Sequence, residues 1–134
     1  MTTVARVLVT EDDHAVRGVI LRVLGQHGYE VIEACQMSEA LDKWHATHDA
    51  SPIDLLITDH MMPGGTGRDL ANELLVLKPD LPVLFMSGYQ DEELIVEPSD
   101  RVVHLSQPFT SAQLLGHVEQ LLRLVRPRSG PGAP

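Results

Sequence analysis

Carboxylates follow two of the most apolar runs in the chain. Glu11 and Asp12 come directly after RVLVT (6–10), and Asp59 comes directly after IDLLIT (53–58). A charged group at the end of a buried strand is costly to desolvate unless an opposite charge meets it. Carboxylates that converge also repel one another unless a cation lies between them. The spacing therefore predicts a cation site at the ends of two strands.

Oxygen ligands favour a small hard dication at this site. Mg²⁺ keeps several of its waters and usually shares one or two carboxylates with a phosphate. An aspartate beside it can then act as a nucleophile and accept a phosphoryl group as an acyl phosphate. Ser87, which ends the run PVLFMS (82–87), is placed to donate to a phosphoryl oxygen. The chemistry predicted is phosphoryl transfer to one of these carboxylates.

The elements that must position these residues are short strands alternating with helices. Four strongly apolar runs have the composition of strands that are covered on both faces, and YEVIEA (29–34) alternates like an edge strand. Strict alternation of five strands and five helices predicts right-handed crossovers and a three-layer α/β domain with a parallel sheet. We expect this domain over residues 4–126, with 127–134 as a tail or linker. Ligands of such sheets bind beyond the carboxyl ends of the strands.

Local signals predict where the helices begin and end. Gly28 follows the first helix at the place of a C-terminal cap, and Ser38 is predicted to cap the second helix. Thr110 and Gln113 have the spacing of a capping box for the last helix. A short, weakly patterned helix is expected over residues 90–98. Three leucines at helical spacing mark a third helix, which is expected to stop near Pro79: Leu70, Leu74 and Leu77.

Net charge, the length of apolar runs and the cysteine count argue against several classes of protein. The 134 residues carry a net charge of −9, which argues against direct binding of nucleic acid by this chain. No apolar run is long enough for a membrane span, and no secretory leader opens the chain. The single cysteine, Cys35, excludes an internal disulfide and suits a reducing compartment. We expect a cytoplasmic domain in which Cys35 is a small packed residue.

Four motifs together resemble the receiver domain of two-component response regulators. They are VLVTEDDHAVR with the acidic pair, LLITDHMMPGGTG with the acceptor aspartate, PVLFMSGY with a hydroxyl, and HLSQPF where the family has a strand followed by Lys-Pro-Phe. The resemblance covers nearly all of the predicted domain. It implies a flavodoxin-like (βα)₅ doubly wound sheet with strand order 2-1-3-4-5. A free-standing regulator and a receiver from a hybrid histidine kinase both fit these motifs.

The resemblance also implies a role for each site residue. Asp59 is then the phospho-acceptor, Asp12 a direct Mg²⁺ ligand, and Glu11 a residue that acts mainly through metal-bound water. The backbone carbonyl of Met61 completes the protein's share of the metal shell, and Ser87 moves toward the phosphoryl group on activation. The implied partners are a histidine kinase or histidine phosphotransfer protein and an unidentified downstream protein.

Two departures from the family pattern concern activation. Gln107 stands where the family has a lysine, so the site loses an ammonium and keeps only a neutral amide donor. The bond between Gln107 and Pro108 resembles the family's cis peptide, which would still direct residue 107 inward. His104 takes the place of an aromatic residue that swings inward on activation. We therefore expect weakened coupling between phosphorylation and response.

Other readings of the same residues remain open. Asp13 fits an N-terminal helix cap, since the helix dipole favours acids there. His14 and His60 flank the acidic cluster and could bind a softer metal such as Zn²⁺, although solvent-facing loop histidines are the preferred interpretation. His104 is expected to be a partly buried core histidine.

Three other functions could use a domain of this kind: a pseudo-receiver, a phosphatase and a flavin carrier. A pseudo-receiver, acting as a protein-interaction module without phosphorylation, rests on Gln107 alone. A phosphatase with an aspartyl nucleophile would want a second aspartate two residues after Asp59, where the chain has Met61. A flavin carrier would want a hydroxyl-rich loop after the first strand, where the chain has acids. The sequence favours a phospho-accepting signalling domain that is not an enzyme in the ordinary sense.

Overall fold

The predicted parallel sheet is present in the computed structural model, which describes residues 4–48, 52–62, 65–87 and 101–125. The helix predicted over 90–98 lies outside this part of the chain. The five strands have the order β2-β1-β3-β6-β7, which is 2-1-3-4-5 when these strands are counted along the chain. The predicted fold class is therefore confirmed. The strands are β1 (Arg6–Thr10), β2 (Glu30–Ala34), β3 (Leu55–Asp59), β6 (Val83–Ser87) and β7 (Val102–Ser106).

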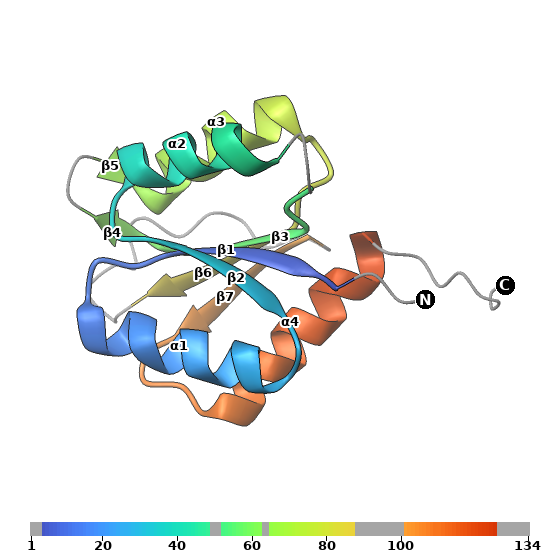
Figure 1. Cartoon of the computed structure of the whole chain (residues 1–134). Coiled ribbons are helices and arrows are strands. Elements are labelled where there is room, and N and C mark those ends of the chain that lie inside the picture. The colour runs from blue at the N-terminus through green and yellow to red at the C-terminus, as the bar shows by residue number, and fades with distance from the viewer. Residues whose placement is uncertain (1–3, 49–51, 63–64, 88–100, 126–134) are drawn as a thin grey trace, which may run out of the picture.

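Helices cover both faces of this sheet, as Figure 1 shows. On one face lie α1 (His14–Gln26) and α4 (Ser111–Val125), and on the other lie α2 (Met37–Thr47) and α3 (Gly67–Leu77). A small antiparallel pair, β4 (Met61–Met62) with β5 (Gly65–Thr66), leads from β3 into α3. None of the helices within the described ranges combines the length and apolar character that a membrane crossing requires.

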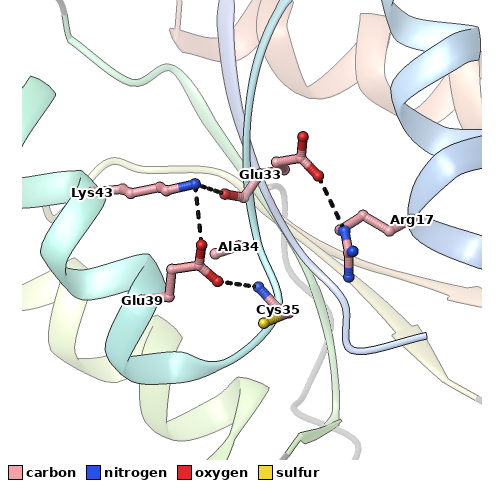
Figure 2. A pocket seen from close by; sticks show the side chains of 6 residues that line it. All are labelled: Arg17, Glu33, Ala34, Cys35, Glu39 and Lys43. Carbon is pink, nitrogen blue, oxygen red and sulfur yellow. Dashed lines mark hydrogen bonds and ion pairs between the residues drawn. The ribbon is translucent and has the colours of Figure 1, made fainter. Parts of the chain in front are cut away.

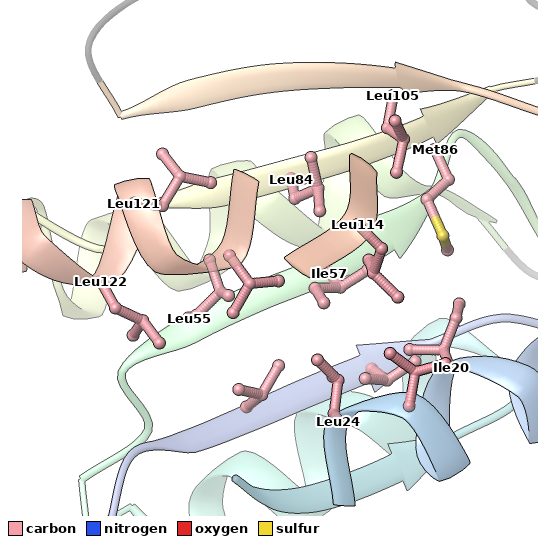
Figure 3. Close-up of a cluster of buried hydrophobic side chains, with 14 of the residues drawn as sticks. Ile20, Leu24, Leu55, Ile57, Leu84, Met86, Leu105, Leu114, Leu121 and Leu122 are labelled. Atoms are coloured by element: carbon pink, nitrogen blue, oxygen red, sulfur yellow. The ribbon is translucent and has the colours of Figure 1, made fainter. Parts of the chain in front are cut away.

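The sheet contributes side chains to two hydrophobic clusters, one on each face, because successive side chains of a strand point to opposite faces. On β3, Leu55 and Ile57 belong to the cluster under α1 and α4, which Figure 3 shows, whereas Leu56 belongs to the cluster under α2 and α3. All three side chains are fully buried. Burial of both faces explains why the central strands read as continuous apolar runs rather than as alternating ones.

Three predicted helix caps are confirmed. The carboxylate of Asp13 accepts hydrogen bonds from the backbone N–H groups of Ala15 and Val16 at 2.9 and 3.0 Å. Thr110 and Gln113 form the reciprocal capping box before α4. Gly28 follows α1 with a φ of 85°, a backbone conformation that favours glycine.

The predicted cap of α2 is wrong. The N-cap residue is Gln36, with extended backbone, and Ser38 already lies within the first turn. Glu39 takes over the capping, because its carboxylate reaches back and accepts from the backbone N–H of Cys35 at 2.8 Å. A side chain from inside the helix therefore accepts from a backbone N–H that lies just before it, and Gln36 itself makes no side-chain cap.

The three leucines that mark α3 differ in burial, because Leu70 and Leu74 are fully buried and Leu77 is not. Leu77 is the last residue of α3 and is 52% exposed. The chain turns at Lys78, whose carbonyl accepts from the N–H of Leu81 at 3.1 Å. Leu81 is only 1% exposed and takes the place in the core that the helical spacing gave to Leu77.

Candidate functional site

Three of the predicted acids converge at the carboxyl ends of β1 and β3. These strands are neighbours, with Thr10 opposite Thr58, so the residues that follow them meet at one edge of the sheet. One carboxylate oxygen each from Glu11, Asp12 and Asp59 lies within 4.8 Å of the others. The structure thus brings together the acidic cluster that the sequence predicted.

Glu11 is the buried member of the cluster, at 1% exposure. Its Oε2 accepts a hydrogen bond from the backbone N–H of Asp13 at 2.9 Å, while its Oε1 is buried with no hydrogen-bond partner among the described residues. Burial raises the pKa of the Glu11 carboxyl from 4.5 to about 8, and the neighbouring acids Asp59 and Asp12 add to the rise. The Asp13 N–H acts in the opposite direction. Without a cation, Glu11 is held as the neutral acid at neutral pH.

This donor set fits a small hard dication. All side-chain ligand atoms of the cluster are oxygens, which Mg²⁺ prefers and which give no preference to Zn²⁺. Asp12 is exposed and Asp59 is half-buried, so the cluster opens to solvent on one side. The buried oxygen of Glu11 without a donor is the kind of group that a cation or its bound water satisfies. The cluster can therefore hold a metal ion.

Backbone near Asp59 is crowded by the start of α3. A Cβ added at Gly67 would lie 2.0 Å from the backbone oxygen of Asp59, so only glycine fits this approach. The N–H of Gly67 also donates to the backbone oxygen of His60 at 2.9 Å. Met61, the predicted carbonyl ligand, is held opposite Thr66 by the β4–β5 pairing. The main chain from Asp59 to Met61 is thus in contact with β5 and the start of α3.

Ser87 and Gln107 lie at the ends of the next two strands. Asp59 is opposite Met86, so Ser87 comes one residue beyond it along the same edge, and Ser87 is opposite Ser106. Gln107 follows Ser106 and is half-buried, and its peptide bond to Pro108 is cis, as predicted. The predicted hydrogen bond from the Ser87 hydroxyl depends on a side chain that lies outside the described part of the structure. The backbone order along this edge is the one that the motifs predicted.

Arg17 supports the acidic end of β1, and the sequence analysis did not single it out. Its Nη1 donates to the backbone oxygen of Glu11 at 2.7 Å, and its Nε donates to Glu33 at 3.2 Å. The guanidinium of Arg17 therefore links the turn after β1, which carries Glu11 and Asp12, to β2. The signal in the sequence was weak, because one arginine on a helix face is ordinary.

The expected solvent exposure of His60 is wrong. The side chain is fully buried, and its ring stacks on Phe85 with ring centres 4.6 Å apart. Thr58 and His60 continue the alternation of β3 beyond Leu56, so this period-two pattern could have placed His60 on the α2/α3 face. His104 is half-buried, as predicted, and His14 is exposed.

Beyond the acidic cluster, a small pocket opens at the end of β2, shown in Figure 2. Its volume is about 170 Å³, and its charged side chains are already paired: Arg17 with Glu33 and Lys43 with Glu39. Cys35 lies at this pocket and is exposed, so the expectation of a packed cysteine is wrong. The hydrogen bond with Glu39 is the main cause that raises the pKa of the Cys35 thiol.

Comparisons with known proteins agree with the motifs. The family model described as response regulator receiver domain matches residues 7–119. The chain is 31% identical over 120 residues to the response regulator receiver protein CpdR of Brucella abortus (strain 2308), which covers 87% of this chain and 96% of CpdR. A solved receiver domain of the hybrid histidine kinase CckA is 36% identical, with a TM-score of 0.72, covering 88% of this chain and 99% of that one.

Longer regulators also match. The chain is 33% identical over 122 residues to the DNA-binding transcriptional regulator NtrC of Rhizobium meliloti (strain 1021). The match covers 90% of this chain and 24% of that protein. The chain therefore spans about a quarter of the length of this curated relative.

Proposed function

Because this chain belongs to the response regulator receiver domain family, we propose that Asp59 accepts a phosphoryl group from a phosphohistidine. The donor is a histidine kinase or a histidine phosphotransfer protein, and the accepted group changes the surface offered to a downstream protein. The observation that carries the proposal is the convergence of Glu11, Asp12 and Asp59 within 4.8 Å at the strand ends. Three carboxylates this close repel one another unless a cation lies between them.

In the transfer, a carboxylate oxygen of Asp59 forms the new bond to phosphorus. The bond between phosphorus and the donor's imidazole nitrogen breaks, and that nitrogen keeps the electron pair. A bound Mg²⁺ supplies positive charge that offsets the charge of the phosphoryl oxygens. Asp12, Asp59 and the backbone carbonyl of Met61 would hold that ion, and Glu11 would act mainly through metal-bound water. Water can later attack the acyl phosphate, so the domain is expected to release its own phosphoryl group.

Gln107 weakens the response without removing the metal site. A glutamine amide can donate to a phosphoryl oxygen but adds no charge, and charge-assisted hydrogen bonds are roughly twice as strong as neutral ones. The deficit is about 1–2 kcal/mol, which corresponds to roughly ten-fold weaker coupling. We expect phosphorylation to occur and its effect on the partner surface to be reduced.

The second candidate is a pseudo-receiver that binds its partner without phosphorylation. Gln107 is the observation in its favour, since the family's lysine contacts the phosphoryl group. The intact acidic cluster argues against it, because a site without chemistry has no need to bury Glu11 beside two other acids. The two functions differ in whether the chain takes up phosphate at all.

Intact mass after incubation with a small acyl phosphate and Mg²⁺ separates them. The proposal predicts one phosphoryl adduct that requires Mg²⁺ and is absent in Asp59→Asn. Asp42→Asn, which removes an exposed carboxylate on α2, is the matched control and is expected to behave like the parent.

A third variant, Gln107→Lys, tests the missing charge. The account predicts an adduct yield or lifetime changed by roughly ten-fold relative to the parent. An adduct in Gln107→Lys alone would mean that one substitution silences an intact site. No adduct in either protein would favour the pseudo-receiver and contradict the proposal.

A further inference from the structure

A stack of three rings lies next to the acceptor, and phosphoryl transfer as proposed makes no use of it. The ring of His60 lies against Phe85, and His104 from β7 completes the stack with its ring centre 5.4 Å from each of the others. Nε2 of His60 and Nδ1 of His104 are 3.4 Å apart. At this distance one ring donates a long hydrogen bond to the other. The buried Nε2 of His60 thus has a partner in the half-buried ring of His104.

The main chain of His60 is tied to the acceptor site. His60 lies between Asp59, the proposed acceptor, and Met61, the proposed carbonyl ligand. Its N–H donates to the backbone oxygen of Met86 at 3.2 Å, and its carbonyl accepts from the N–H of Gly67 at 2.9 Å. With the backbone held on both sides, a shift at either ligand must tilt the buried ring. The ring of His60 is therefore placed next to both of these residues, on a main chain that is bonded to β6 and to α3.

His104 connects the same stack to β7. It lies opposite Phe85 in the pairing of β6 with β7 and three residues before Gln107. The resemblance implies an aromatic residue at position 104 that swings inward, whereas this ring is half-buried and packed against two others. Offset rings can slide past each other at little cost, but a hydrogen bond is directional and resists sliding. The imidazole pair is thus a stiffer link than an apolar ring would be.

We propose that the hydrogen bond between His60 and His104 transmits occupancy of the Asp59 site to β7, with His104 as a positioning residue. The inference rests on the proposed function, since it describes how that site regulates the partner surface. A displacement of His60 either carries His104 with it or breaks their contact. The link acts in parallel with residue 107, where the chain has lost a charge.

Two substitutions at one position separate the hydrogen bond from the stacking. His104→Phe keeps the ring and removes the ring nitrogens. His104→Asn removes the ring and keeps a polar group near the position of Nδ1. Val103→Ala, on the opposite face of β7, is the matched control for a general loss of packing. Nuclear magnetic resonance of backbone amides reads out the response to beryllium fluoride with Mg²⁺, a phosphoryl mimic.

The amide of Gly67 reports on the site, and the amide of Leu105 reports on β7. The proposal predicts that both signals shift in the parent, in Val103→Ala and in His104→Asn. In His104→Phe the Gly67 shift remains while the Leu105 shift falls by about five-fold, the low end of allosteric coupling.

Other outcomes overturn the proposal in distinguishable ways. A Leu105 shift kept in His104→Phe and lost in His104→Asn would assign the coupling to ring stacking. Equal Leu105 shifts in all four proteins would mean that this contact transmits nothing. A Gly67 amide that does not respond in the parent would overturn the proposed function, and this inference with it.

Discussion

Glu11 shows how one residue combines a structural cost with a functional use. The side chain is 1% exposed, and its carboxyl carries a pKa raised from 4.5 to about 8, chiefly by burial. A raised acid pKa in the folded protein means that the folded state binds a proton which the unfolded state has released. The cost of this position falls on the metal-free protein, and a bound cation removes it.

The stability of the metal-free protein should therefore depend on pH in a defined direction. The contribution of Glu11 to the free energy of unfolding is greatest at pH values below 4.5. It is lost as the pH rises toward about 8, the pKa of this carboxyl in the folded protein. Thermal unfolding followed by circular dichroism should give a midpoint that falls across this window. Added Mg²⁺ should raise the midpoint more at the upper end of the window than at the lower end, because it replaces the proton.

Glu11→Gln isolates this contribution from the other titrating groups. The variant cannot ionise at position 11, so its midpoint should fall less steeply with pH, and Mg²⁺ should have little effect on it. Parallel pH curves for the parent and the variant would contradict the assignment of the raised pKa to Glu11.

At the scale of elements, the start of α3 fixes the loop that follows the acceptor. Thr66 caps the helix in a reciprocal capping box with Asp69, and Gly67 approaches the backbone of Asp59 more closely than any other residue type could. The helix therefore holds the acceptor's main chain from outside the sheet. The position of the Asp59 main chain therefore depends on its contact with Gly67 as well as on its place in β3.

Gly67→Ala should damage the site through the backbone. The added Cβ would lie 2.0 Å from the oxygen of Asp59, so β3 or α3 must move. We expect a loss of about 1–3 kcal/mol in the free energy of unfolding, measured by denaturant titration, together with weaker Mg²⁺ binding. Gly18→Ala is the matched control, because a Cβ there meets nothing within 4 Å and its helical position should gain about 0.5–1 kcal/mol. Equal effects of both changes would contradict the close approach.

Elements differed in how far the sequence predicted them. Strands covered on both faces were readable, since burial makes them uniformly apolar, and the acids at their ends pointed to the site. His60 was missed because it follows Asp59 in what appeared to be a loop, although the pleat of β3 continues through it. The cap of α2 was missed because Glu39 reaches back from within the helix to Cys35. A side chain that caps a helix from within it, or that continues the pleat of a strand past its predicted end, does not produce the local sequence pattern by which helix and strand ends are predicted.

Across the whole molecule, the two hydrophobic clusters divide the stability between the faces of the sheet. Leu121 on α4 and Leu74 on α3 are both fully buried, one in each cluster. Each substitution to alanine should cost about 2–5 kcal/mol in the free energy of unfolding. Val76→Ala is the surface comparison, because Val76 is 80% exposed, and it should stay within about 0.5 kcal/mol of the parent. A small effect at either leucine would contradict the view that both clusters contribute to the stability of the fold.

The layered architecture itself was predictable from the sequence, because alternation of strands and helices leaves few topologies for a parallel sheet. The exposure of Leu77 was not, since it depends on the turn at Lys78 and on Leu81 filling the same space. The convergence of the acids followed from the order of the parallel strands. The hydrogen bond from Arg17 to the backbone oxygen of Glu11 has no such pattern in the sequence and was found only in the structure.

The most direct test of the central claim locates the phosphoryl group in the chain. Borohydride reduces an aspartyl phosphate to homoserine, so peptide mass analysis after treatment with an acyl phosphate and Mg²⁺ identifies the acceptor. The account predicts homoserine at position 59 and unmodified carboxylates at Glu11 and Asp12. An adduct that leaves Asp59 unreduced would contradict it, because the phosphoryl group would then lie on another residue.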